Sequence, residues 1–346
     1  MSRDDLRPLA GLLRQVRDLK RIRDARSPRS LAERAFARSW ARLGAGEAPE
    51  AVAFGETARA VAAVRLAGLD REAMTAHGLT GKEASGVLVR AFDDVAGPIE
   101  AGLRRRLRNA LDAAPPEASG AGPAGDPPAF VAALIAQPRA GATHPGLPRR
   151  VLEPAESHGD HCFVTAAFGV LLAPAFGAAP EAVFMTGLAH HLFNTTLPDA
   201  GYAADVLIGD ALGARMAEAA ADRALGQLRE PLRQIARDAI ARTRESAFGT
   251  PPARAFHAAD VLDRTLEMEW HASAARFRLA DALGRDTARG QLDICHDGFY
   301  QRFQQDVLER AGVWAFASDA EASGDGASAA GPPSPVPISA PEAHNT

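Results

Sequence analysis

Cysteine is scarce in this chain, and its placement excludes two classes of small domain. The 346 residues include two cysteines, Cys162 and Cys295, which lie far apart and form no CxxC pair. Such a pattern cannot supply a disulfide framework or a four-cysteine zinc site. It is typical of a protein kept in a reducing compartment, so we expect the cytoplasm.

Aromatic residues make up only 6% of the chain, and runs of β-branched residues are nearly absent. Alanine, leucine and arginine, which favour helices, dominate instead. The composition therefore predicts an all-α protein, a multi-helix bundle. No apolar stretch is expected to be long enough to span a bilayer, and the N-terminus lacks the apolar region of a signal peptide.

Lysine is the third scarce residue, with only Lys20 and Lys82 present, so arginine is the usual cation. The net charge of −4 gives no general reason to expect nucleic acid or an anionic membrane as a partner. Residues 1–43 nevertheless carry twelve basic and five acidic side chains. Leucines and valine at three- and four-residue steps between Leu6 and Leu19 predict an amphipathic helix there. We expect it to pack on its own domain; contact with nucleic acid remains the alternative.

Composition changes divide the chain into four regions. Residues 1–112 form an N-terminal helical region, and residues 113–128, rich in Pro, Gly and Ala, form a linker or long loop. Residues 129–316 form a second helical domain, and residues 317–346 have the composition of a disordered tail. Whether the two helical regions are one domain or two is left open. Helical patterns are expected at Glu56–Ala67, Asp70–His77, Thr80–Phe92, Ile99–Leu111, Ala129–Gln137, Ala211–Ala224, Pro231–Glu245, Ala253–Leu283 and Asp297–Val313.

The most informative stretch is Ser157–Asp210, in which histidines stand at the ends of two apolar helices. His158, Asp160 and His161 precede the first helix, and the doublet His190-His191 ends the second, 29 residues after His161. Imidazole is a ligand for Zn, Fe, Co and Ni, and metal sites in helical bundles draw ligands from facing helices. The spacing therefore predicts a metal centre.

This pattern resembles the HD superfamily of metal-dependent phosphohydrolases, whose ligands are a His, a His-Asp doublet and a distant Asp. The match spans roughly residues 149–313 and is closest to the nucleotidase branch. Leu188-Ala189-His190-His191-Leu192 resembles the doublet segment of the family, and Asp260 stands at the place of the distant Asp. The chain departs from the family at His191, which replaces the namesake Asp.

The resemblance implies roles for individual residues. The metal ligands would be His161, His190, His191 and Asp260, with His158 and Asp160 as further ligands or as partners that orient His161. Asp199 would serve in proton transfer, and Asn194 stands where the nucleotidase branch has a Glu, although an amide cannot transfer a proton. Arg149 and Arg150 would bind the substrate phosphate; a surface pair is the alternative reading. His191 in place of Asp favours a single divalent transition metal, with Fe, Mn, Zn, Co or Ni left open.

Other polar residues of this half are expected to be structural. Asp263 and Glu267 are predicted to form exposed pairs that contribute little to stability. His271 and His296 are isolated from other ligands in the sequence and are expected to be structural.

Three functions follow from these residues. The first is a hydrolase of a small phosphorylated substrate such as a nucleotide. The second is an iron- and oxygen-dependent enzyme on the same scaffold, and the third is a binding or regulatory protein with a vestigial site. Homo-oligomerisation is left open.

Overall fold

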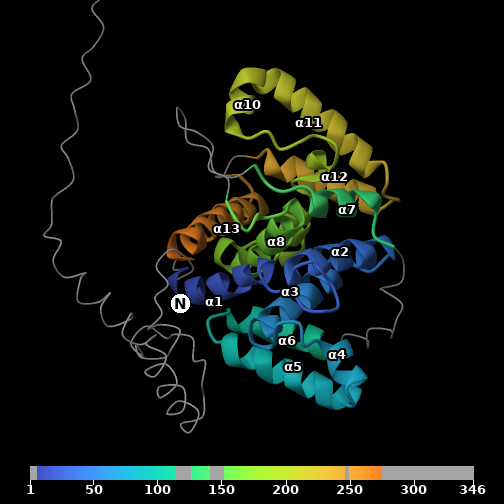
Figure 1. Ribbon diagram of the computed structural model, residues 1–346, viewed down its shortest axis with the longest axis vertical. Helices are drawn as coiled ribbons and strands as arrows, with labels where there is room; N and C mark the ends of the chain where they lie inside the picture. Colours follow the sequence, from blue (N-terminus) through green and yellow to red (C-terminus); the bar gives the residue numbers. More distant parts are fainter. Residues whose placement is uncertain (1–5, 114–125, 141–151, 246–248, 275–346) are drawn as a thin grey trace, which may run out of the picture. The chain divides into compact units, whose positions relative to one another are not determined.

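The structure is a computed structural model that describes residues 6–113, 126–140, 152–245 and 249–274. Among these residues all regular structure is helical, apart from the isolated β-bridges Asp24–Ser27 and Pro138–Ser157. The predicted all-α multi-helix fold is therefore confirmed (Figure 1). The predicted helix at Asp297–Val313 and the predicted tail at 317–346 lie outside the described residues.

The helices lie close to the predicted positions, and their bounds are as follows. They are α1 (Arg7–Arg17), η1 (Asp18–Lys20), α2 (Leu31–Gly44), α3 (Pro49–Leu66), α4 (Arg71–Ala76), α5 (Gly81–Val95), α6 (Ala101–Ala113), α7 (Ala129–Ala136), α8 (His158–Phe176), α9 (Pro180–Ala189), η2 (Leu192–Thr195), α10 (Tyr202–Ile208), α11 (Asp210–Leu225), α12 (Leu232–Thr243) and α13 (Pro251–Ala274). Helix α3 begins seven residues before its predicted start, at a proline suited to a first helical turn. Helix α2 was not predicted, although Ser30 and Glu33 form a complete capping box at its start.

The start of α8 is fixed by a capping box of its own. The Ser157 hydroxyl accepts a hydrogen bond from the Asp160 backbone, and the Asp160 carboxylate accepts one from the Ser157 backbone. This arrangement satisfies amides that the first turn leaves without intrahelical partners. It also begins the helix at His158, which places two histidines in the first turn.

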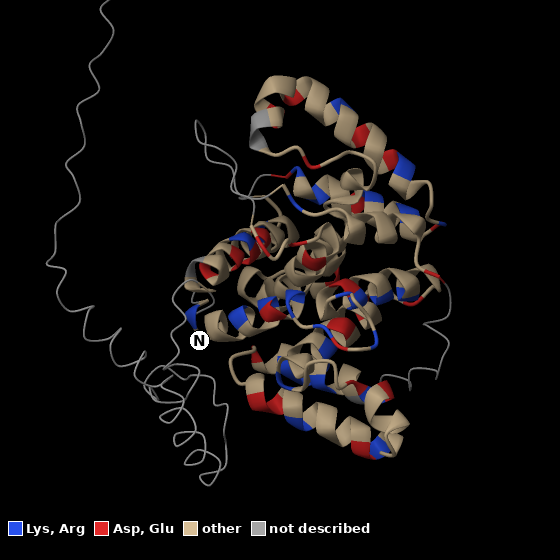
Figure 2. Ribbon diagram, viewed as in Figure 1, with Lys and Arg blue, Asp and Glu red and all other residues tan. Residues whose placement is uncertain are grey.

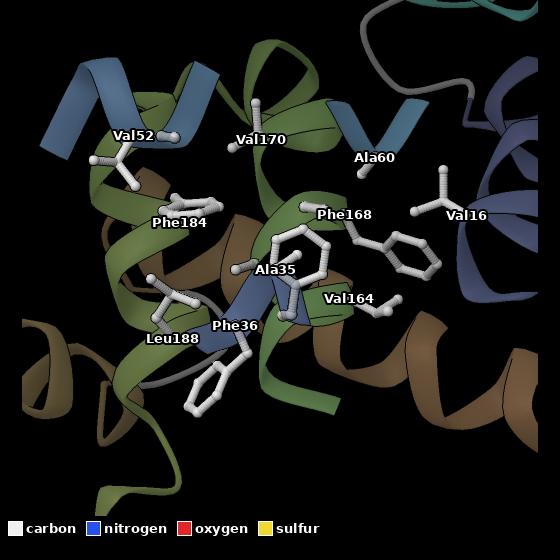
Figure 3. Packing of buried hydrophobic residues seen from close by; sticks show 14 of the residues in the cluster. Val16, Ala35, Phe36, Val52, Ala60, Val164, Phe168, Val170, Phe184 and Leu188 are labelled. Atoms are coloured by element: carbon white, nitrogen blue, oxygen red, sulfur yellow. The ribbon is translucent and has the colours of Figure 1, made fainter. Parts of the chain in front are cut away.

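Helix α8 lies at the centre of the core and is buried along nearly its whole length. It packs against α9, α2, α7 and α3. Figure 3 shows Phe36 of α2 beside Leu188 of α9, and Phe168 of α8 directed toward Val16 of α1. These side chains are fully buried, so the N-terminal helices and the helices that carry the histidines pack into the same hydrophobic core.

Helices α8 and α9 approach each other closely at a glycine. A Cβ atom at Gly187 of α9 would lie 2.5 Å from the Ala166 Cα of α8. Since backbone atoms cannot yield as a side chain can, only glycine permits this approach. The contact brings the C-terminal end of α9 close to α8.

Residues 1–271 form one compact unit, and the second unit, residues 272–346, lies almost entirely outside the described residues. The N-terminal helices share one hydrophobic core with α7, α8, α9, α11, α12 and part of α13. The described helices on either side of residues 113–128 therefore belong to one compact unit.

The basic N-terminal region is neutralised largely within the protein. Arg26 and Arg34 both contact Asp24 and Asp70, and Arg42 contacts the buried Glu56. Figure 2 shows Lys and Arg interspersed with Asp and Glu along the helices. This pairing supports the expectation that the region packs on its own domain.

One described helix, α8, is long and apolar enough to cross a membrane, whereas the sequence was expected to contain no apolar stretch of that length. Its mean hydropathy is 1.4, and 83% of its apolar window is buried within the protein. Such burial is that of a core helix.

Candidate metal centre

Three helices bring the predicted ligands together. His161 comes from the first turn of α8, His190 caps α9 with His191 next to it, and Asp260 comes from α13. The Nε2 atoms of His161 and His190 are 3.0 Å apart, and His161 Nε2 is 3.2 Å from Asp260 Oδ1. One ring nitrogen from each of the three histidines lies within 4.8 Å of the others, so they could hold a metal ion.

The second ring nitrogen of each histidine is already engaged. The Nδ1 atom of His161 lies 2.6 Å from Asp263 Oδ2, that of His190 lies 2.7 Å from Gly187 O, and that of His191 lies 2.7 Å from Asn194 Oδ1. These oxygens accept hydrogen bonds, which places the proton of each neutral ring on Nδ1. Each Nε2 is left with a free lone pair, as a metal ligand requires.

The resulting arrangement fits a cation. Two nitrogen lone pairs and a carboxylate oxygen that face one another at 3.0–3.2 Å repel unless a positive charge lies among them. Burial lowers the pKa of His190 to about 3, which disfavours a proton on that ring as the positive charge. A set of three imidazoles and one carboxylate suits Zn, Fe, Co or Ni.

The ligands have the protonation states that binding requires. Burial is the main cause that lowers the pKa of His191 well below its ordinary value. Burial alone would raise the pKa of Asp260, but nearby positive charge, that of Arg264 included, holds it well below the ordinary range. The rings of His190 and His191 are thus neutral and the Asp260 carboxylate is ionised at neutral pH, so binding a metal does not have to displace protons from these groups.

His158 lies at the edge of this group. Its ring is 4.9 Å from that of His191, its Nδ1 lies 3.1 Å from Gln137 O, and its buried Nε2 has no hydrogen-bond partner. Burial lowers the pKa of His158 to about 4. The nearest charged group is Asp199, with Oδ2 at 3.7 Å from Nε2. His158 is therefore a buried neighbour of the three histidines whose Nε2 has no hydrogen-bond partner.

Asp160 does not point to the metal position. Its carboxylate accepts hydrogen bonds from Ser157 and from the Ser30 hydroxyl of α2. Burial raises its pKa to about 7. The expectation that Asp160 would be a ligand or would orient His161 is wrong, because the capping box of α8 holds its carboxylate.

Asp199 and Asn194 occupy different positions. Asp199 is partly exposed and accepts backbone hydrogen bonds from Ala140 at 2.9 Å and Gly201 at 3.2 Å. Asn194 is buried, and its Nδ2 donates to Leu197 O at 3.1 Å while its Oδ1 holds His191. Asn194 is therefore a positioning residue for His191. Arg149 and Arg150 lie outside the described residues.

The prediction that Asp263 and Glu267 form exposed pairs is wrong. Asp263 is fully buried and Glu267 is 5% exposed, and both face cations of the N-terminal region. Lys20 lies 2.8 Å from Asp263 Oδ2, and Arg21 forms an ion pair with Glu267. The sequence could not show this, because the partners are more than 240 residues apart.

Glu156, Lys20 and Arg139 are further charged residues around the site that were not predicted. Glu156 forms ion pairs with Lys20 and with Arg139, the latter at 3.8 Å, and lies 3.9 Å from His161 Nδ1. The only signal in the sequence was Lys20 itself, a lysine in a chain that otherwise uses arginine.

The chain matches no family model, no curated protein and no solved structure. The HD-like character of the core accordingly remains a prediction from the sequence.

Proposed function

We propose that the chain is a metal-dependent hydrolase of a small phosphate ester such as a nucleotide, built on a divergent HD-type core. The observation that carries this proposal is the convergence of His161 Nε2, His190 Nε2 and Asp260 Oδ1, with every Nδ1 nitrogen of the three histidines held by an acceptor. A buried set of this kind costs stability unless a cation compensates it.

The proposed ion is a single divalent transition metal held by His161, His190, His191 and Asp260. When bound, such an ion would polarise a phosphoryl oxygen and make a nearby water more acidic. Asp263 and Asn194 keep two of the imidazoles in the ligand tautomer. Asp199, which is partly exposed and next to His158, is the group we assign to proton transfer with the leaving oxygen.

Arg264 is a described residue that could contact a substrate phosphate. Its side chain is 59% exposed, and its Nε lies 4.0 Å from Asp260 Oδ1. A planar guanidinium can hold two phosphate oxygens at once. Arg149 and Arg150 keep the role that the sequence resemblance implies. We place this activity in the cytoplasm, where Cys162 would remain a free thiol.

The proposal is tested by elemental analysis of protein purified without added metal. We expect a near-stoichiometric transition metal in the wild-type chain and a large loss in His191→Ala. The exposed histidine that caps α4 provides a matched control, so His77→Ala should retain the metal. Absence of metal from both wild type and variant, with none taken up on incubation, would refute the proposed metal-dependent activity. A phosphomonoesterase screen across metals then tests the reaction.

The iron- and oxygen-dependent alternative is favoured by one observation, the ligand set itself. Histidines with a single carboxylate and without a bridging Asp are the donors of many mononuclear iron oxygenases. If the bound metal is iron, substrate-dependent oxygen consumption distinguishes this enzyme from a hydrolase, which consumes none.

A further inference from the structure

A group of acidic side chains lies beside the metal centre and surrounds the ammonium of a lysine. The Nζ atom of Lys20 forms an ion pair with Glu156, lies 2.7 Å from Asp263 Oδ1 and lies 3.7 Å from Glu267 Oε2. The Lys20 side chain is fully buried, although it belongs to η1 at the other end of the sequence. Glu156, Asp263 and Glu267 are called the carboxylate cluster below.

The cluster has more acceptor capacity than Lys20 satisfies. Glu267 Oε2 is buried and has no hydrogen-bond partner, and the buried Asp263 Oδ1 has only its ion pair with Nζ. An ammonium has three hydrogens, whereas a metal ion accepts ligands from six or more directions. A carboxylate oxygen of Glu156 and one of Asp263 also lie within 4.8 Å of each other, close enough to be ligands of one ion.

We propose that the ammonium of Lys20 occupies a latent second cation site and so restricts the protein to one transition metal. This inference rests on the proposed metal at His161, His190 and His191, because Asp263 of the carboxylate cluster holds His161. Arg21 pairs with Glu267 and Arg139 with Glu156, so without Lys20 the carboxylate cluster would keep one negative charge uncompensated in the core, which is strongly unfavourable. Lys20 supplies the missing positive charge, and because its ammonium is part of the chain it cannot dissociate.

Lys20 is consequently a positioning residue. It touches no substrate because it is fully buried, but it holds Asp263, which in turn orients His161. The all-oxygen carboxylates of the latent site favour Mn²⁺, Mg²⁺ or Ca²⁺, whereas the histidine centre favours Zn²⁺. The two positions can therefore be filled with different metals.

The test compares Lys20→Ala with Lys20→Met in Zn²⁺-loaded protein dialysed against Mn²⁺. Alanine removes the charge and opens space for an ion, whereas methionine removes the charge and fills the space. We expect Lys20→Ala to take up one further equivalent of Mn²⁺, and wild type and Lys20→Met to take up none, by elemental analysis and Mn²⁺ electron paramagnetic resonance. A folded Lys20→Ala that binds no Mn²⁺, or a wild-type chain that binds it at this position, would overturn the proposal.

Folding and function are separated by two further measurements. If Lys20→Ala does not fold alone, the proposal requires Mn²⁺ to restore its folded circular dichroism spectrum but not that of Lys20→Met; a chain that stays unfolded in Mn²⁺ contradicts it. In a His190→Ala background Zn²⁺ is lost, yet Lys20→Ala should still gain Mn²⁺. Failure of Zn²⁺ binding thus bears on the proposed enzyme, and failure of Mn²⁺ uptake bears on Lys20.

Discussion

At the scale of single residues, the candidate site depends on the atoms behind the ligands. His161, His190 and His191 could each be a structural histidine if judged by sequence alone. Their Nδ1 partners, a carboxylate, a backbone carbonyl and an amide oxygen, all hold the ring in the tautomer that frees Nε2. Mutation of partners of this kind typically lowers metal affinity about 10- to 100-fold.

Asp263→Asn tests that dependence. Asparagine keeps the shape of the side chain but removes the negative charge that orients and strengthens His161 as a ligand. We expect metal affinity to fall roughly 10- to 100-fold, measured by competition with a chelator of known affinity. The exposed Asp222→Asn on α11 should leave affinity unchanged. Equal affinity of Asp263→Asn and wild type would mean that His161 is not a ligand.

At the scale of elements, the site requires α8 and α9 to touch. His190 follows Gly187 by one helical turn, so any separation of the helices at Gly187 moves His190 away from His161. The ligand geometry is therefore coupled to a contact between small residues in the core. Two of the three elements that carry ligands meet in this way.

Gly187→Ala is expected to weaken both packing and metal binding. The new methyl group would lie within 3 Å of Ala166 backbone atoms, and overpacking of this kind costs about 1–3 kcal/mol. Chemical denaturation and a metal titration measure the two effects. Gly11→Ala in α1, where no atom lies within 4 Å of the new Cβ, should instead stabilise by ~0.5–1 kcal/mol. Unchanged stability of Gly187→Ala would contradict the close approach.

At the scale of the whole molecule, buried charges join parts that are distant in sequence. Lys20 connects η1 to α13, and Ser30 of α2 connects to Asp160 of α8. Glu56 is fully buried in α3 and contacts Arg38 and Arg42 of α2. The stability of the compact unit should therefore depend on pH through such carboxylates.

Glu56 gives that dependence a definite sign. Burial would raise its pKa, but Arg38 and the neighbouring arginines lower it to about 2. Because the folded-state pKa lies below the ordinary value, the ionised carboxylate stabilises the fold above that ordinary value. This stability, of the order of 3 kcal/mol, is lost as the pH falls toward about 2.

Glu56→Gln should therefore lower the free energy of unfolding at pH 7 and flatten its decline below pH ~5, measured by urea denaturation across pH. Glu50→Gln, which removes an exposed pair with Arg106, should change stability by less than about 1 kcal/mol. Parallel pH profiles of Glu56→Gln and wild type would show that the Glu56 carboxylate does not cause the pH dependence of the free energy of unfolding.

The sequence by itself determined most of the helices and the spacing of the histidines. Capping boxes, prolines at first turns and apolar periodicity act over a few residues, so Thr80–Glu83 and the start of α8 can be read locally. The 29-residue step from His161 to His190 fits two helices joined by a turn, and the structure brings these residues together.

Only the tertiary structure decided which charged residues are buried, because burial depends on what packs against a helix from elsewhere in the chain. Asp263 and Glu267 have the same local pattern as a solvated helix face, yet η1 covers them with Lys20. The pair of Lys20 and Asp263 joins residues 243 apart. Local sequence cannot encode such a contact, since it forms only when the core brings the two ends of the unit together.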